Sequence, residues 1–345
     1  MSRKEIDRYY NVLRLRNNFL DLFSASRYAL KFKIIFIGFV GLLTSYFFSL
    51  AGSFLTVLLF TDYHESFIFI GIIPVVIPNI DLPILANVIL FIGYILAISS
   101  ILITSSIIAV TITEYLKGDR DFSGPNIRKF LNTNFTNILF APLGFVVIIM
   151  FFFALSILLA LLTKLPVIGL LLYFFLIPLL CLIGMFLVYT ILAMINGMLF
   201  LPSIAATWGH DMMGIIFQSY SILWARPWLL ISGLFVSLLN AVISFSGLFY
   251  LFKAGFWIVR RFSDLNVLAS YNEVFPKFGL DLFLQDNFIF QIATMPKSSI
   301  IIMLWYIAAL LISLSFGLSS FISTQTLLFI RIKQDENDIN LLKIS

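Results

Sequence analysis

The chain has 345 residues, of which 61% are hydrophobic and only 11% charged, and its mean hydropathy is +1.05. Soluble domains carry about 25% charged residues, so this composition excludes an ordinary soluble protein. The formal net charge of +5 comes from basic residues beside apolar runs, a pattern typical of membrane orientation. We therefore expect contacts with membrane lipids and no nucleic-acid partner.

The first 33 residues form a basic, polar arm. Ser2-Arg3-Lys4-Glu5 has the spacing of a capping box, which predicts a helix that starts there. One side of that helix is apolar and the other polar, as in a helix lying along a membrane surface. The apolar side comprises Ile6, Tyr9, Tyr10, Leu13, Leu20 and Phe23. The sequence predicts a cytoplasmic amphipathic N-terminal arm over residues 1–33.

Six apolar segments follow, each longer than the roughly 20 residues that a transmembrane helix needs. They cover residues 34–60, 84–113, 137–163, 167–201, 228–252 and 299–330, and none contains Asp, Glu, Lys, Arg or His. The predicted fold class is an all-α integral membrane protein: a bundle of about six transmembrane helices over 34–330, with an amphipathic N-terminal helix and a cytoplasmic tail over 331–345.

The fourth segment is too long for one simple span. A helix over 167–201 would measure about 52 Å at 1.5 Å per residue, whereas the hydrocarbon core is about 30 Å thick. Two explanations stay open. The helix bends at Pro178 or at Asn196-Gly197, or its end extends into the cytoplasm.

Basic residues predict the orientation, because cytoplasmic loops carry an excess of Lys and Arg. One face has sixteen: Arg3, Lys4, Arg8, Arg14, Arg16, Arg27, Lys31, Lys33, Lys117, Arg120, Arg128, Lys129, Arg226, Arg331, Lys333 and Lys343. The other face has six: Lys164, Lys253, Arg260, Arg261, Lys277 and Lys297. Both termini are therefore expected to be cytoplasmic, although the cluster from Lys253 to Arg261 opposes this orientation.

Two connections on the predicted outer face are expected to have structure of their own. The first, from Thr61 to Pro83, contains an apolar run interrupted by Pro74 and Pro78, and we expect an interfacial or re-entrant segment. The fifth, from Lys253 to Lys297, mixes aromatic and charged residues, which is typical of helices lying in the membrane interface.

Residues with catalytic potential are few. His64 and His210 lie in connections on opposite faces, so they are not expected to share a metal. Asp211 precedes Met212-Met213-Gly214 and is interpreted as a helix N-cap in preference to an acid–base partner of His210. Residues 117–126 combine charges with Gly, Pro, Asn and Asp, which favours a structural turn over a catalytic loop. No catalytic, cofactor or metal residue is predicted, and no enzymatic activity is expected.

Small residues recur at four-residue spacing, which brings transmembrane helices close together. Such stripes are Gly41, Ser45, Ser49 and Ser53 in the first span, Ser105, Ala109 and Thr113 in the second, and Ala309, Ser313 and Gly317 in the last. The stripes of the first and last spans form our candidate helix-packing interface. A conduction path and a subunit interface stay open as alternatives to packing within the bundle.

A further pattern lies between residues 141 and 228. Its parts, in order, are Ala141-Pro142-Leu143, Leu165-Pro166-Val167-Ile168-Gly169, Trp208-Gly209-His210-Asp211, Phe217-Gln218-Ser219-Tyr220-Ser221 and Arg226-Pro227-Trp228. This order resembles a group of uncharacterised polytopic bacterial membrane proteins, found among planctomycetes, and distantly the membrane domain joined to glycerophosphodiester phosphodiesterases. The resemblance implies a bacterial inner membrane and no activity. His210 and Asp211 stand where that group more usually has small polar residues, so no residue role is carried over.

These observations favour a non-enzymatic membrane scaffold or accessory subunit of a membrane protein complex. The absence of charge within the six segments and the stripes of small residues support it. The first alternative is a transporter, channel or lipid-handling protein without buried ionisable groups, with a path between the second and sixth spans. An enzyme that acts on a lipid at the cytoplasmic face is the third candidate.

Overall fold

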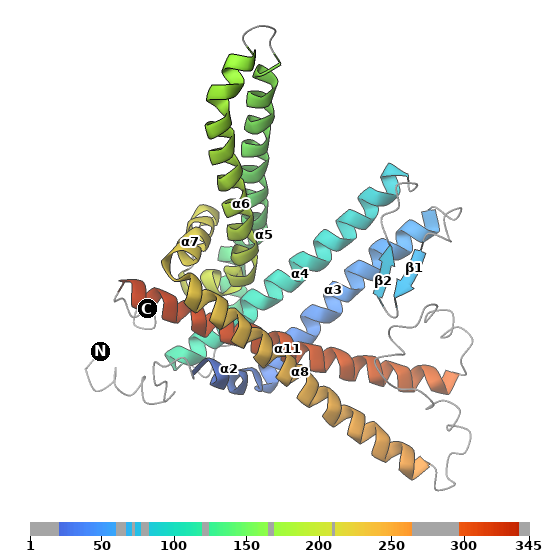
Figure 1. Ribbon diagram of the computed structural model, residues 1–345. Helices are drawn as coiled ribbons and strands as arrows, with labels where there is room; N and C mark the ends of the chain where they lie inside the picture. Colours follow the sequence, from blue (N-terminus) through green and yellow to red (C-terminus); the bar gives the residue numbers. More distant parts are fainter. Residues whose placement is uncertain are drawn as a thin grey trace, which may run out of the picture. The chain divides into compact units, whose positions relative to one another are not determined.

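The computed structural model describes residues 21–59, 67–70, 73–76, 83–118, 124–164, 169–208, 211–263 and 297–337. Figure 1 shows these elements as ribbons. Within the described residues the helices are α2 (Asp21–Ala29), α3 (Phe32–Leu59), α4 (Ile84–Lys117), α5 (Gly124–Leu162), α6 (Gly169–Trp208), α7 (Met212–Ala225), α8 (Pro227–Ser263) and α11 (Lys297–Asn337), and the strands are β1 (Phe67–Ile70) and β2 (Ile73–Val76).

Among the described residues, six helices are long and apolar enough to cross a membrane. Their candidate spans are Phe32–Thr56, Ile84–Lys117, Gly124–Leu162, Phe174–Thr207, Pro227–Val259 and Trp305–Lys333. Each overlaps one of the six segments expected from the sequence, although the third begins at Gly124 and not at residue 137. The predicted fold class is confirmed: the chain is an all-α, multi-pass integral membrane protein, apart from two short strands.

The structure describes only the two ends of the turn predicted over residues 117–126, and residues 119–123 lie outside the described part of the chain. Helix α4 ends at Lys117, and Gly118 follows with a φ of 95°, the left-handed conformation that glycine adopts after helix ends. Its amide donates a hydrogen bond to the Tyr115 carbonyl. Helix α5 already begins at Gly124, with Pro125 in its first turn, where proline is favoured because its missing N–H is not needed there.

Helix α6 is continuous over 40 residues and contains Pro178 and Pro202. The helix is not interrupted at Pro178 or at Asn196-Gly197, and a bend at either position stays a prediction. The apolar candidate span within it covers Phe174–Thr207. Internal prolines cost a backbone hydrogen bond, but transmembrane helices tolerate them because neighbouring groups can satisfy the freed carbonyls.

The first connection contains a β-hairpin. Strands β1 and β2 pair antiparallel, with Phe67 opposite Val76 and Phe69 opposite Pro74, and β2 contacts α3. Because β1 and β2 form the whole two-stranded sheet, a proline is tolerated in β2. Here the chain folds back, as expected, but it does so by strand pairing, and an interfacial position stays a prediction.

Helices α2 and α11 lie near the two ends of the chain. The predicted N-terminal helix lies outside the described residues up to Leu20, and α2 covers its end from Asp21 onward, with Leu22 and Ala25 buried. Burial raises the pKa of the Tyr28 hydroxyl, an effect that the positive charge of Arg27 partly offsets. At the other end, α11 runs to Asn337, past residue 330 where the sequence placed the end of the last span.

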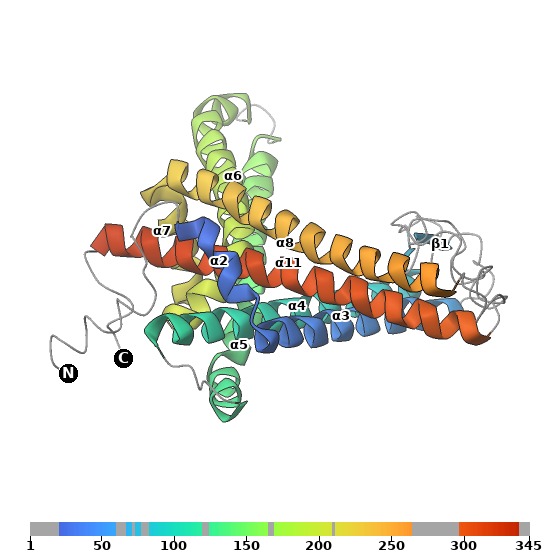
Figure 2. The ribbon, with the colours of Figure 1, turned by 90° about the horizontal axis from the view of Figure 1, so that it is seen from below.

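The chain divides by its internal contacts into two compact units, which we describe separately. Unit 1 contains α5, α6 and α7, with α4 from Ser105, α8 up to Leu238 and α11 from Phe321. Unit 2 contains α3 and the hairpin, with α4 up to Thr104, α8 from Leu239 and α11 up to Ser320. Within unit 1, α5 and α6 run side by side, and both contact α7 (Figures 1 and 2).

Candidate functional site

The predicted stripe on α3 lies mostly on a buried face. Gly41, Ser45 and Ser53 are buried, whereas Ser49 is half-exposed. A Cβ added at Gly41 would clash with the Thr104 side chain of α4. The stripe therefore lies where α3 meets another helix of unit 2, and its role as the packing interface stays a prediction that bulky substitutions can test.

Three further contacts of α3, with α4 and α11, were not predicted from the sequence. A Cβ added at Gly52 would lie 3.0 Å from the Gly93 Cα atom of α4, and one at Gly38 would clash with Ser315 of α11. Thr44 also shares a 2.6 Å hydrogen bond with Ser100 of α4. Gly38, Gly52 and Gly93 do not belong to the four-residue stripes, and only the pairing of helix faces reveals them.

On α11, the predicted residues Ala309, Ser313 and Gly317 are all buried. A Cβ at Gly317 would lie 3.1 Å from the Cβ atom of Phe245 and 3.2 Å from the Ala241 carbonyl oxygen, so α8 packs closely here within unit 2. The Ser313 hydroxyl donates to the Ala309 carbonyl of its own helix. The hydroxyl is therefore satisfied without a partner on another helix.

In unit 1, α7 fits against two glycines of the longer helices. A Cβ at Gly144 of α5 would lie 2.6 Å from the Ile216 Cδ1 atom, and one at Gly197 of α6 would lie 2.8 Å from the Ser219 hydroxyl. Phe145 adds an aromatic contact with Tyr220, at a ring distance of 6.0 Å. We call this arrangement, in which α7 lies on Gly144 of α5 and Gly197 of α6, the α7 socket.

Side chains of α6 also bind the backbone of α7 in the socket. The Asn196 amide donates to the Ser219 carbonyl at 3.2 Å, and the Tyr189 hydroxyl donates to the Tyr220 carbonyl at 3.3 Å. Two neighbouring carbonyls of α7 thus accept bonds from one helix. This fixes both the position and the rotation of α7 on α6.

The third side of the socket is formed by α11. Lys333, which is 2% exposed, donates from Nζ to the Ser221 hydroxyl at 2.9 Å. Nearer the middle of α11, Thr326 shares a 3.2 Å hydrogen bond with Ser203 of α6. The sequence predicts that Lys333 lies in the cytoplasmic tail. Its burial depends on α11 continuing as a helix beside α7.

Asp211 occupies the predicted N-cap position of α7, with φ −57° and ψ 162°, but its side chain makes no capping hydrogen bond. The residue is exposed. The expectation of a capping side chain is therefore wrong, although the helix start is correct. His210 and His64 lie outside the described residues, so the acid–base alternative for His210 and Asp211 is not tested here.

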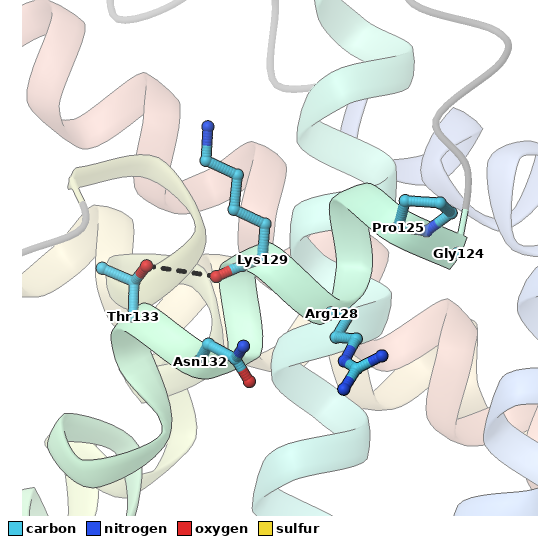
Figure 3. A pocket seen from close by; sticks show the side chains of 6 residues that line it. All are labelled: Gly124, Pro125, Arg128, Lys129, Asn132 and Thr133. Carbon is cyan, nitrogen blue, oxygen red and sulfur yellow. Dashed lines mark hydrogen bonds between the residues drawn. The ribbon is translucent and has the colours of Figure 1, made fainter.

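A hollow of about 510 Å³ lies on the first turns of α5 (Figure 3). It is lined by Gly124, Pro125, Arg128, Lys129, Asn132 and Thr133. The Thr133 hydroxyl is already bonded to the Lys129 carbonyl one turn earlier. The lining side chains are exposed, and all six lining residues belong to the single helix α5.

Among the described residues, no group of three or more His, Cys, Asp or Glu residues lies together that could hold a metal ion. The ion pair found in the same part of the chain joins Lys117 and Glu114 at 3.0 Å, on one turn of α4. No protein-family model, curated protein or solved structure matches the chain. Its function must therefore be argued from its own residues.

Proposed function

We propose that this integral membrane protein is a non-enzymatic scaffold or accessory subunit of a membrane protein complex. We place it in a bacterial inner membrane with both termini in the cytoplasm. The orientation rests on the distribution of basic residues, and the bacterial membrane on the resemblance between Ala141 and Trp228 to polytopic bacterial proteins. The partner class, another membrane protein, rests on the exposed surface of the α5–α6 hairpin.

This hairpin is the part of the membrane region that the rest of the chain covers least. Only 6% of the most apolar window of α5 and 11% of that of α6 are buried, compared with 56% for α11. Its exposed side chains include Val147, Met150 and Phe151 on α5, and Leu182, Met185 and Val188 on α6. No described part of the chain covers that surface, and lipid and a second membrane protein are the two candidates to cover it.

Gly184 favours a protein partner on part of this surface. A Cβ added there would meet nothing within 4 Å, and Cys181, one turn before it, is exposed. Close approach of helix backbones in membranes depends on small residues at the contact, because packing rather than the hydrophobic effect drives association there. An open glycine on an exposed face allows a partner helix to approach closely, a feature that contact with lipid does not need.

Site-specific photo-crosslinking in intact cells tests this proposal. A photo-reactive residue at Met185, which is exposed, should crosslink to one protein of defined mass, whereas one at Ile183, which is 7% exposed, should not. The same protein should co-purify in mild detergent and be lost from a Gly184→Leu variant. Crosslinks to lipid alone at Met185, with no protein adduct, would contradict the scaffold proposal.

The second candidate is a transporter, channel or lipid-handling protein, and buried hydroxyls on α11 favour it. In unit 2 these are Ser313, Ser315, Ser319 and Ser320, all 0% exposed. Ser315 donates to the Ile35 carbonyl of α3, so part of this polar surface joins helices. Conductance of purified protein in planar bilayers, above a protein-free background, would support this candidate over the scaffold.

A further inference from the structure

Helix α7 has the dimensions and connections of a helix that lies along one membrane surface. Its 14 residues measure about 21 Å at 1.5 Å per residue, which is too short to cross a hydrocarbon core of about 30 Å. The candidate span of α6 ends at Thr207, and that of α8 begins at Pro227. Because both ends of α7 join the ends of spans, the whole helix is held at the depth where the hydrocarbon begins.

The two faces of α7 differ in what covers them. Ile215, Ser219 and Ile222 are fully buried in unit 1, at 0% exposure. Met213, Phe217 and Trp224 share the opposite face, at spacings that bring helical residues to one side. They are 57%, 70% and 80% exposed, so this large apolar face is covered by no described part of the chain.

The residues after this face identify what covers it. Trp228, in the first turn of α8, is 82% exposed, and Arg226 between the two helices is exposed as well. Tryptophan is enriched where acyl chains meet headgroups, and arginine can keep its stem in an apolar region while its charge reaches the polar one. An apolar face flanked by indoles and a cation matches a phospholipid leaflet with anionic headgroups.

We propose that α7 is a membrane-interface helix. Its face of Met213, Phe217 and Trp224 inserts among the acyl chains of one leaflet, and the Arg226 guanidinium binds the phosphate of a glycerophospholipid. The α7 socket holds the opposite face. This assignment concerns lipid binding and is independent of the partner protein proposed above.

Spin labels test the insertion of the apolar face. In a Cys181→Ser background, Met213→Cys and Phe217→Cys would each carry a nitroxide, and the full-length protein would be reconstituted in phosphatidylethanolamine–phosphatidylglycerol vesicles. Both labels should collide more often with oxygen, which concentrates in lipid, than with a water-soluble nickel chelate. Asn132→Cys, on the exposed hollow of α5, is the aqueous control and should show the reverse. A nickel preference at both α7 positions would overturn the proposal, because the face would then be open to water and suited to a soluble partner.

A second measurement tests the phosphate contact of Arg226. Short-chain phosphatidylglycerol should raise the Tm of the wild-type protein in neutral detergent, and the Arg226→Gln variant should lose that shift. Arg128→Gln, a matched change at an exposed arginine of α5, should keep it. Inorganic phosphate should have no effect at the same concentration. An equal shift with inorganic phosphate, or an undiminished lipid shift in Arg226→Gln, would refute the assignment of a lipid phosphate to Arg226.

Discussion

The side chain of Lys333 donates a hydrogen bond to the Ser221 hydroxyl, and the residue is only 2% exposed. Burying an ammonium group is costly unless hydrogen bonds or charges compensate. A hydrogen bond made by a charged donor contributes about 1.5 to 3 kcal/mol net, more than a neutral one. This hydrogen bond joins the end of α11 to α7, and its loss should measurably lower the free energy of unfolding.

A double-mutant cycle measures this pair. Lys333→Met and Ser221→Ala should each lower the free energy of unfolding, and the double variant should lose less than the sum, with a coupling of about 0.5 to 3 kcal/mol. Reversible unfolding in detergent provides the measurement. Ser156→Ala is the control, because the Ser156 hydroxyl bonds within α5 to the Phe152 carbonyl, and its effect should add to that of Lys333→Met. Additivity of Lys333 and Ser221 would mean that their hydrogen bond contributes nothing to stability.

At the scale of a helix, α3 shows how small residues determine contact distance. Gly41 lies against Thr104, and Gly52 lies against Gly93, so the two helices approach closely at positions three turns apart on α3. Closely packed helices have no space for added methylene groups. Overpacking typically costs about 1 to 3 kcal/mol at each site.

Bulky substitutions on α3 test the predicted packing stripe. Ser45→Leu, at a residue that is 8% exposed, should lower the Tm in detergent because it forces α3 away from its neighbour. Ser49→Leu should have a smaller effect, since Ser49 is half-exposed. The control is Leu43→Phe, which adds bulk at a position that is 45% exposed. Wild-type stability in Ser45→Leu would show that this part of the stripe is not a packing surface.

For the whole molecule, the six spans do not show on which side of the membrane the termini lie. An even number of spans puts both termini on one side of the membrane. The excess of basic residues beside the termini and the second loop predicts that this side is cytoplasmic. The first residues of α4 and α5, Ile84 and Gly124, are both exposed and provide positions for a direct test.

Cysteine labelling in intact cells checks the orientation. In the Cys181→Ser background, Ile84→Cys at the start of α4 should react with a membrane-impermeant thiol reagent, and Gly124→Cys at the start of α5 should be protected until the cells are opened. The physical reason is that one helix, α4, separates the two positions by a whole membrane. If only Gly124→Cys were labelled in intact cells, the protein would have the opposite orientation in the membrane.

The number and approximate limits of the spans could be predicted from local sequence alone. Crossing a membrane requires a continuous apolar stretch of sufficient length, and this is a local property that residues 34–60 or 228–252 show without reference to any other part of the chain. The same reasoning located the start of α7 after Asp211. The four-residue spacing of small residues also identified Gly41 and Gly317, because such spacing can be counted along one helix.

Which helix faces meet could not be predicted from the sequence. The contact of Gly52 with Gly93, the α7 socket at Gly144 and Gly197, and the burial of Lys333 each depend on a second helix whose rotation and depth no local pattern specifies. The Asp211 side chain likewise makes no capping bond, although its residue type favours one. Hydrophobic length fixes where a helix enters the membrane, whereas packing depends on side-chain shape between segments far apart in the chain, such as Ser221 and Lys333.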